Sequence, residues 1–134
     1  MGKTKSSRKK AVEKLDKIFS QYIRLRHAIN GDAQCVTCGA RKPWKELQCG
    51  HYESRGSFGT RWDEKNCHVQ CYGCNVARKG NYPAYARYMV STYGASILDT
   101  LAWKANNSPK LMTVELELLI VEYEGKVKEL LTKQ

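Results

Sequence analysis

The sequence contains no run of about 18 apolar residues, so it offers no segment that could cross a bilayer as a helix. No apolar stretch follows its basic start, MGKTKSSRKK, which therefore does not have the form of a secretory signal. That start fits the letters of a myristoylation motif, but nothing else points to a membrane. Internal repeats and low-complexity tracts are also absent. These absences predict a cytosolic protein, and 134 residues suit one domain or one domain with an extension.

The charge of the chain is unevenly distributed around a formal net value of +10. Residues 1–98 carry 18 basic and 7 acidic side chains, whereas residues 99–134 carry 5 basic and 6 acidic ones. A basic N-terminal part that also contains many Tyr and Trp residues favours a polyanionic partner, most simply nucleic acid. The alternative is a protein whose basic charge serves only its solubility.

Four of the six cysteines form two Cys-x-x-Cys pairs, Cys35 with Cys38 and Cys71 with Cys74. In a cytosolic chain such pairs are more typical of metal binding than of disulfides. Each pair can direct two thiolates at one ion, and four thiolates complete a tetrahedral zinc site that has no open position. We therefore expect a structural Zn²⁺ ion that ties two distant segments together and contributes to folding.

Two further cysteines, Cys49 and Cys67, lie outside these pairs. We expect both in the core. The alternative is a second metal site that they form with His51 or His68. A lone histidine is usually a surface or packing residue, and we expect this for His68 and His27.

The N-terminal half of the chain is predicted to have three parts. Residues 1–8 are expected to form a disordered basic arm. In residues 9–30, apolar side chains recur every three or four positions, which predicts a helix from about Lys9 to Ala28. Residues 31–94 form the third part. Up to position 80 this part is rich in Cys, Gly and Arg, which favours short strands and tight loops. Pro83 then begins a short helix that Gly94 ends, and its tyrosine stripe is expected in the core.

Residues 95–134 are predicted to form a C-terminal helical extension. A short helix is expected at 95–105, followed by a long one from about Lys110 to Leu131, with Ser108 as N-cap and Pro109 in its first turn. The final helix is long for so small a domain, so part of its apolar face is expected to meet a second subunit.

The central motifs resemble those of a known nuclease superfamily. The segments CVTCGA, CGHYESRG, RWDEKNCHVQCYGCNVARKGNYPAYARYM and STYG together span residues 35–94. Their order resembles the HNH, or ββα-metal, pattern of Cys-x-x-Cys, Asp-His, Asn and Cys-x-x-Cys-His/Asn. The closer resemblance is to the NinG/Rap family of phage recombination proteins. The arrangement is also similar to the endonuclease VII-type junction resolvases, which place an Asn directly after the second Cys-x-x-Cys.

This resemblance implies an α+β fold, in which a small zinc-braced ββα-metal core is flanked by the N-terminal helix and the C-terminal helices. A hairpin would carry His51 as the general base that activates water. A helix beginning near Asn75 would hold a catalytic Mg²⁺ or Mn²⁺ ion through the Asn75 side-chain oxygen. Asn66 would brace the loop beside His51, or serve as an ordinary turn residue.

The sequence departs from the HNH pattern at Gly50, where many of these enzymes have a metal-binding Asp. Either Asn75 suffices together with waters and phosphate oxygens, or Glu53 or Asp63 reaches the ion. Arg55 and Arg61 are expected to clamp phosphate, with a plain surface role as the alternative. Further basic residues either contact DNA phosphates or form a solvated surface: Lys10, Lys14, Lys17, Arg24, Arg78 and Lys79.

The resemblance implies a phage-encoded, structure-specific endonuclease that cuts branched DNA such as Holliday junctions and D-loops in the cytoplasm of the bacterial host. A junction has two-fold symmetry and needs two cuts, so a homodimer through the first and last helices is expected. Three alternatives remain: a non-catalytic zinc-ribbon DNA-binding module, a nonspecific or restriction-type HNH nuclease, and a zinc-stapled protein-interaction domain.

Overall fold

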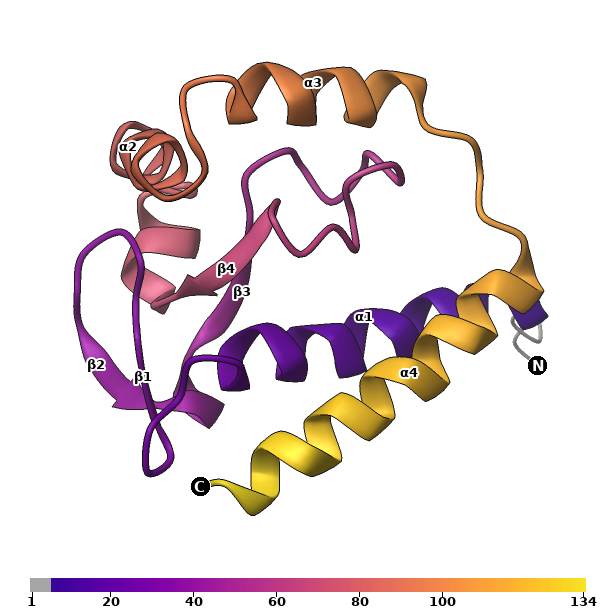
Figure 1. Cartoon of the computed structure of the whole chain (residues 1–134), viewed down its shortest axis with the longest axis horizontal. Coiled ribbons are helices and arrows are strands. Elements are labelled where there is room, and N and C mark those ends of the chain that lie inside the picture. Colours follow the sequence, from indigo (N-terminus) through magenta and orange to yellow (C-terminus); the bar gives the residue numbers. More distant parts are fainter. Residues whose placement is uncertain (1–5) are drawn as a thin grey trace.

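The computed structural model describes residues 6–134 (Figure 1). The expected mixture of helices and small sheets is confirmed. In chain order the elements are α1 (Ser7–Leu25), β1 (Asp32–Gln34), β2 (Arg41–Pro43), η1 (Trp44–Glu46), β3 (Gln48–His51), β4 (Cys67–Gln70), η2 (Gly73–Ala77), α2 (Tyr82–Tyr93), α3 (Ile97–Asn107) and α4 (Thr113–Thr132). None of the helices in this part of the chain is long and apolar enough to span a membrane.

Helix α1 begins earlier and ends earlier than the sequence pattern predicted. The Ser6 hydroxyl accepts a hydrogen bond from the Lys9 backbone N–H and caps the helix, so residues 7 and 8 are helical rather than part of an arm. Residues 1–5 of that predicted arm lie outside the described residues. The helix ends at Leu25, and the left-handed residues Asn30 and Gly31 follow a few positions later, where the NGD sequence was expected to break it.

Two antiparallel hairpins form the sheets, as the short strands predicted between residues 33 and 80 suggested. Strand β1 pairs with β2, and β3 pairs with β4 with His51 opposite Cys67 and Cys49 opposite Val69. Side chains alternate between the two faces of a strand, and directly opposed residues share a face. Cys49, His51 and Cys67 therefore lie on one face of the β3–β4 hairpin.

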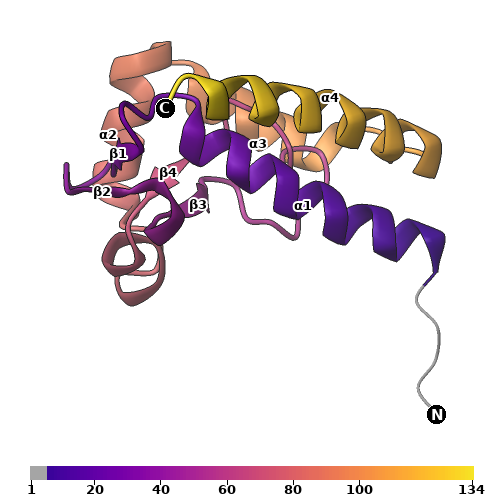
Figure 2. The same ribbon diagram turned by 90° about the horizontal axis from the view of Figure 1, so that it is seen from below.

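Helices α1 and α4 lie side by side and run in the same direction (Figures 1 and 2). At one end Arg8 donates a hydrogen bond to the Leu111 carbonyl, and at the other the Gly31 N–H donates to Gln134. Their buried side chains form one core, which includes Leu15, Phe19, Ile23, Leu116, Ile120 and Tyr123. The apolar face that suggested a second subunit is thus covered mainly within the same chain.

The start of α4 differs from the prediction. Ser108 does not cap this helix; its hydroxyl donates to the Lys104 carbonyl and closes the end of α3. Pro109 and Lys110 lie in the connection, and α4 begins only at Thr113, where Glu115 accepts a hydrogen bond from the Met112 N–H. The prediction of Ser108 as N-cap was wrong because its hydroxyl is already hydrogen-bonded to the last turn of α3.

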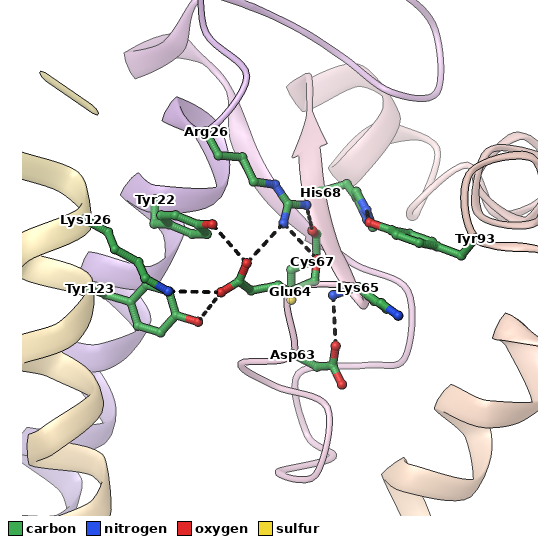
Figure 3. Close-up of polar contacts among 10 residues, drawn as sticks. All are labelled: Tyr22, Arg26, Asp63, Glu64, Lys65, Cys67, His68, Tyr93, Tyr123 and Lys126. Carbon is green, nitrogen blue, oxygen red and sulfur yellow. Dashed lines mark hydrogen bonds and ion pairs between the residues drawn. The ribbon is translucent and has the colours of Figure 1, made fainter. Parts of the chain in front are cut away.

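A carboxylate joins α1 and α4 to the loop before β4 (Figure 3). Glu64 accepts hydrogen bonds from Tyr22 of α1 at 2.9 Å and from Tyr123 of α4 at 2.7 Å, and it pairs with Lys126 at 3.5 Å. Arg26 donates to the backbone carbonyl of Glu64 and to that of Cys67. The network fixes the helix pair relative to the strand that carries Cys67.

Helices α2 and α3 cover the opposite face of the β3–β4 hairpin. Tyr85, Met89, Ile97 and Leu101 form their buried core, in agreement with the expectation that the tyrosine stripe packs inward. His68 lies beneath them, with one ring nitrogen 3.0 Å from the Tyr85 hydroxyl and the other 2.8 Å from that of Tyr93. His68 is therefore a packing residue, as expected, whereas His27 is exposed.

Candidate functional site

The two Cys-x-x-Cys pairs converge on one point. Their four Sγ atoms all lie within 4.8 Å of one another, although 33 residues separate Cys38 from Cys71. Cys35 follows β1, Cys38 lies in the turn to β2, Cys71 follows β4, and Cys74 belongs to the π-helix η2. Four thiols at this spacing can bind a metal ion such as zinc, whose bonds to sulfur are about 2.3 Å long.

Hydrogen-bond donors surround these sulfur atoms. Burial alone would raise the pKa of Cys35, but hydrogen bonding from Thr37 and nearby backbone groups lowers it to about 6. The Cys74 N–H and the Asn81 amide also donate to sulfur in the cluster. For Cys38 the Ala40 backbone lowers the pKa, but burial and the three neighbouring thiols raise it to about 12. The donors thus favour one thiolate at Cys35, and a metal ion would be needed to hold all four thiolates together.

A pocket of about 590 Å³ is lined by Asn75, the residue that follows Cys74 of the cluster. One wall comes from α1, and the others come from β3, the loop that follows it, and η2. Its lining includes Asp16, Ser20, Arg24, Gln48, Cys49, His51, Arg55 and Asn75. Four residues predicted to act at the site or on DNA therefore line one cavity: Arg24, His51, Arg55 and Asn75.

His51 ends strand β3 and has a defined tautomer. Its Nε2 atom lies 2.9 Å from the Arg61 carbonyl oxygen, which can only accept, so Nε2 carries the proton. The other ring nitrogen, Nδ1, is then unprotonated. Burial lowers the pKa of His51; the Arg61 carbonyl and the charge of Asp16 oppose this, and the charges of Arg55 and Arg61 reinforce it. The ring is accordingly neutral at pH 7 and can accept a proton.

Asn66 is fully buried and organises the loop after His51. Its Oδ1 atom accepts a hydrogen bond from the Glu53 N–H, and its Nδ2 group donates to the carbonyls of Glu53 and Thr60. These three bonds close the loop between residues 53 and 60. Asn66 therefore shapes the wall of the pocket without lining it.

Asn75 lines the pocket, but not from the helix that was expected. Residues Gly73–Ala77 form a single five-residue π-helix, and the next regular helix starts only at Tyr82. The Asn75 Nδ2 group donates to Gln48 at 2.8 Å, which fixes the orientation of the amide. Among the described residues no hydrogen bond to Asn75 Oδ1 is found, so this oxygen is available to a ligand.

Arg61 does not fit its predicted role as a phosphate clamp. Its Nε and Nη2 groups bind the two carboxylate oxygens of Asp16 at 2.9 and 2.5 Å, and Nη1 donates to the Arg55 carbonyl. The guanidinium also stacks against the rings of Phe58 and Trp62. Each of the three nitrogens thus already donates a hydrogen bond, which uses three of the five N–H groups, and the residue fixes the carbonyl that holds His51. Arg55, by contrast, is exposed and borders the pocket.

The whole chain matches a known protein family. Residues 2–133 match the family described as Bacteriophage Lambda NinG protein. The chain belongs to the NinG family. It is similar to Protein ninG of Salmonella phage P22, with 26% identity over 120 residues, and to Protein ninG of Escherichia phage lambda, with 26% identity over 121 residues. These alignments cover 89% of the chain but only 57% and 56% of the two relatives.

This NinG-family chain thus spans little more than half the length of the relatives it matches. A relative from Escherichia phage 933W shows the same identity, 26% over 121 residues, and the same partial coverage. No solved structure matches the chain.

The acidic residues of the NinG-family chain are not placed as the sequence suggested. Asp63 pairs with Lys104 and accepts from the Lys65 N–H, and neither Asp63 nor Glu53 lines the pocket. The carboxylate that does line it is Asp16 of α1, which sequence reasoning missed. The sequence did contain one indication of this acidic residue. Asp16, Ser20 and Arg24 are spaced four residues apart and therefore lie on one face of the helix.

Gly50 occupies the position where the HNH pattern has an acidic ligand, and the structure gives the reason. A Cβ atom there would lie 1.9 Å from Oε1 and 2.6 Å from Cδ of Gln70. Because side chains alternate along β3, any side chain at this position would also point away from the face that carries His51. Gly50 therefore cannot be replaced by a ligand without moving Gln70.

The remaining basic residues of the NinG-family chain are dispersed. Arg24 lines the pocket but stacks on Trp44, 5.1 Å from its ring. Lys10 and Lys14 border a separate groove between α1 and α4, and Lys17 is exposed on α1. Two further exposed cations, Arg78 and Lys79, follow η2 in a turn rather than continuing a metal-binding helix, with Lys79 at φ +50°.

Proposed function

We propose that this chain is a metal-dependent endonuclease that cuts branched DNA, with His51 as the general base. The observation that carries the proposal is the state of His51: the Arg61 carbonyl holds its Nε2 proton, and Nδ1 has no hydrogen-bond partner among residues 6–134. A neutral imidazole in a cavity shared with Asn75 and Arg55 is suited to activate water beside a phosphate. The preference for branched DNA rests on the resemblance to NinG/Rap recombination proteins.

In this mechanism His51 Nδ1 accepts a proton from water as the water oxygen attacks the phosphorus atom. The bond from phosphorus to the 3′ oxygen then breaks, and solvent protonates the leaving oxygen. Arg55 would contact a non-bridging phosphate oxygen and offset its growing charge. The Arg61–Asp16 pair holds the loop that orients His51, as a positioning pair rather than a phosphate clamp.

The pocket fits a catalytic Mg²⁺ or Mn²⁺ ion only with help from the substrate. Both Asp16 oxygens are engaged by Arg61 and Trp62, so Asn75 Oδ1 is the protein oxygen that would hold the ion. Mg²⁺ commonly retains several waters and binds substrate phosphates with few protein ligands. When bound, it would supply positive charge at the scissile phosphate.

The four-cysteine cluster is proposed as a closed structural Zn²⁺ site. All four potential ligands are thiols, and a four-thiolate site leaves no position for water or substrate. Its role would be to hold η2, and with it Asn75, against the β1–β2 hairpin.

We further propose a homodimer and action in the cytoplasm of the bacterial host. Although α4 packs on α1, it also exposes a row of apolar side chains, with Val114, Leu118 and Val121 between 53% and 69% exposed. Their spacing of four and three residues places them on one helix face. Two copies joined through this row would supply the two active sites that a two-fold symmetric junction requires.

The proposal is tested by cleavage of a synthetic four-way junction and a matched linear duplex, with and without Mg²⁺. His51→Ala is expected to reduce the cleavage rate by about 100-fold or more, because a general base contributes on that scale. Junction binding, measured by gel shift, should remain. His27→Ala is the matched control, since His27 is exposed and lies outside the pocket.

Two results would contradict parts of the proposal. Tight binding without cleavage in Mg²⁺ or Mn²⁺ would make the chain a non-catalytic zinc module that binds DNA. Equal cleavage of the linear duplex would retain the catalytic role of His51 but remove the specificity for branched DNA.

A further inference from the structure

The hairpin β3–β4 brings together a second group of metal-binding side chains. The Sγ atoms of Cys49 and Cys67 and a ring nitrogen of His51 all lie within 4.8 Å of one another. Cys49 and His51 alternate along β3, and Cys67 is the residue directly opposite His51 on β4. The three side chains therefore share one face, and this group contains none of the four cysteines of the first cluster.

The chemistry of this group suits a thiophilic divalent cation. Two thiolates and one imidazole are ligands that zinc accepts, whereas Mg²⁺ prefers oxygen. Metal-binding histidines usually donate their second ring N–H to a carbonyl or carboxylate, and the bond from His51 Nε2 to the Arg61 carbonyl provides this. Nδ1 is then left for the ion.

The position of the group gives the site an open side. Cys67 is fully buried against α1, while Cys49 and His51 line the 590 Å³ pocket. An ion held by three protein ligands would have its fourth position directed to this cavity, the arrangement of zinc sites that bind an exchangeable ligand. The four-cysteine cluster has no such position.

We infer that Cys49, His51 and Cys67 form a second metal site, for a divalent cation of the zinc class, that is open to the pocket. The inference goes beyond the proposed function and does not depend on nuclease activity. It adds a constraint, since an ion on His51 Nδ1 uses the nitrogen that the proposed base needs. The metal-bound form and the base-competent form of His51 are mutually exclusive.

Metal content of the purified full chain tests the inference. After reductive purification, incubation with excess Zn²⁺ and exhaustive dialysis, wild type is expected to retain two zinc ions per chain, one for each cluster. Cys49→Ser and His51→Ala should each retain one. Ser20→Ala is the control for the pocket, because Ser20 lines it without offering a ligand, and it should retain two.

Cobalt substitution identifies which site is lost. Co²⁺ bound to four thiolates and Co²⁺ bound to two thiolates and an imidazole absorb differently, and only the second spectrum should disappear in Cys49→Ser and His51→Ala. Circular dichroism verifies that each variant is folded. One zinc ion in wild type overturns the inference, and so does an intact mass that shows a Cys49–Cys67 disulfide after reductive purification.

Discussion

At the residue scale, single atoms around His51 decide what the pocket can do. The Arg61 carbonyl selects the tautomer of the ring, and the two bonds from Arg61 to Asp16 hold that carbonyl in place. The sequence predicted Arg61 as a ligand of phosphate because it follows the histidine loop. The structure shows that its partner is an acid 45 residues earlier in the chain.

Gly50→Ala is expected to destabilise the protein by about 1–3 kcal/mol, because the new Cβ would meet the buried Gln70 side chain at 1.9 Å. Urea denaturation measures the change, and the double variant Gly50→Ala/Gln70→Ala should lose less stability than the sum of the two single variants, because Gln70→Ala removes the clash but also the Gln70 hydrogen bonds. Gly125→Ala is the control, since nothing lies within 4 Å of a Cβ there and the residue is inside α4. It should stabilise by up to about 1 kcal/mol. Equal effects at the two glycines would contradict the packing argument.

At the element scale, the parallel helices α1 and α4 form a frame that the Glu64 network joins to β4 (Figure 3). Burial opposes ionisation of Glu64, but hydrogen bonds from Tyr123 and Tyr22 and the charges of Lys126 and Arg26 outweigh it and lower its pKa. A lowered carboxyl pKa stabilises the fold above the ordinary value of 4.5, and this stability is lost as the pH falls through the folded value.

Glu64→Gln is therefore expected to lower the free energy of unfolding by about 1 kcal/mol at pH 7, a modest value because the group is partly exposed. The difference from wild type should shrink as the pH is lowered through 4.5. Thermal unfolding across this range measures it. Glu129→Gln, at an exposed pair with Lys133, serves as the control and should have little effect at any pH. A difference for Glu64→Gln that does not change with pH would contradict the network's electrostatic role.

At the scale of the whole molecule, the four-cysteine cluster connects segments that no regular sheet joins. It links the β1–β2 turn to η2, and η2 carries Asn75 into the pocket. A bound ion stabilises the folded state by mass action, because the unfolded chain does not present four converging thiolates.

Removal of this ion is expected to loosen β1–β2 and η2 while α1 and α4 remain helical, since their contacts are with each other. Cys38→Ser tests this, because Cys38 is exposed and its replacement removes one ligand without opening the core. Its melting temperature, followed by circular dichroism, should fall toward that of chelator-treated wild type, which would lose the ion of the second group as well. A melting temperature that neither Cys38→Ser nor a strong chelator changes would show that the cluster holds no structural ion.

The sequence by itself determined the features that depend on residues close together in the chain. The Cys-x-x-Cys spacing indicated a four-cysteine cluster, apolar periodicity located the helices to within a few residues, and Gly50 marked a departure that a local clash now explains. These predictions succeeded because spacing within a few residues fixes side-chain direction on a helix, strand or turn.

Only the tertiary structure decided which distant residues meet. It paired Asp16 with Arg61 and packed α4 along α1. It directed the Ser108 hydroxyl to a carbonyl of α3 rather than to the start of α4. It also brought Cys49, His51 and Cys67 to one face of a hairpin whose register no local pattern specified. The physical reason is that, in an isolated segment, the groups joined by these contacts could form hydrogen bonds or contacts with many other partners. Only the packing of all the elements together leaves one partner within reach.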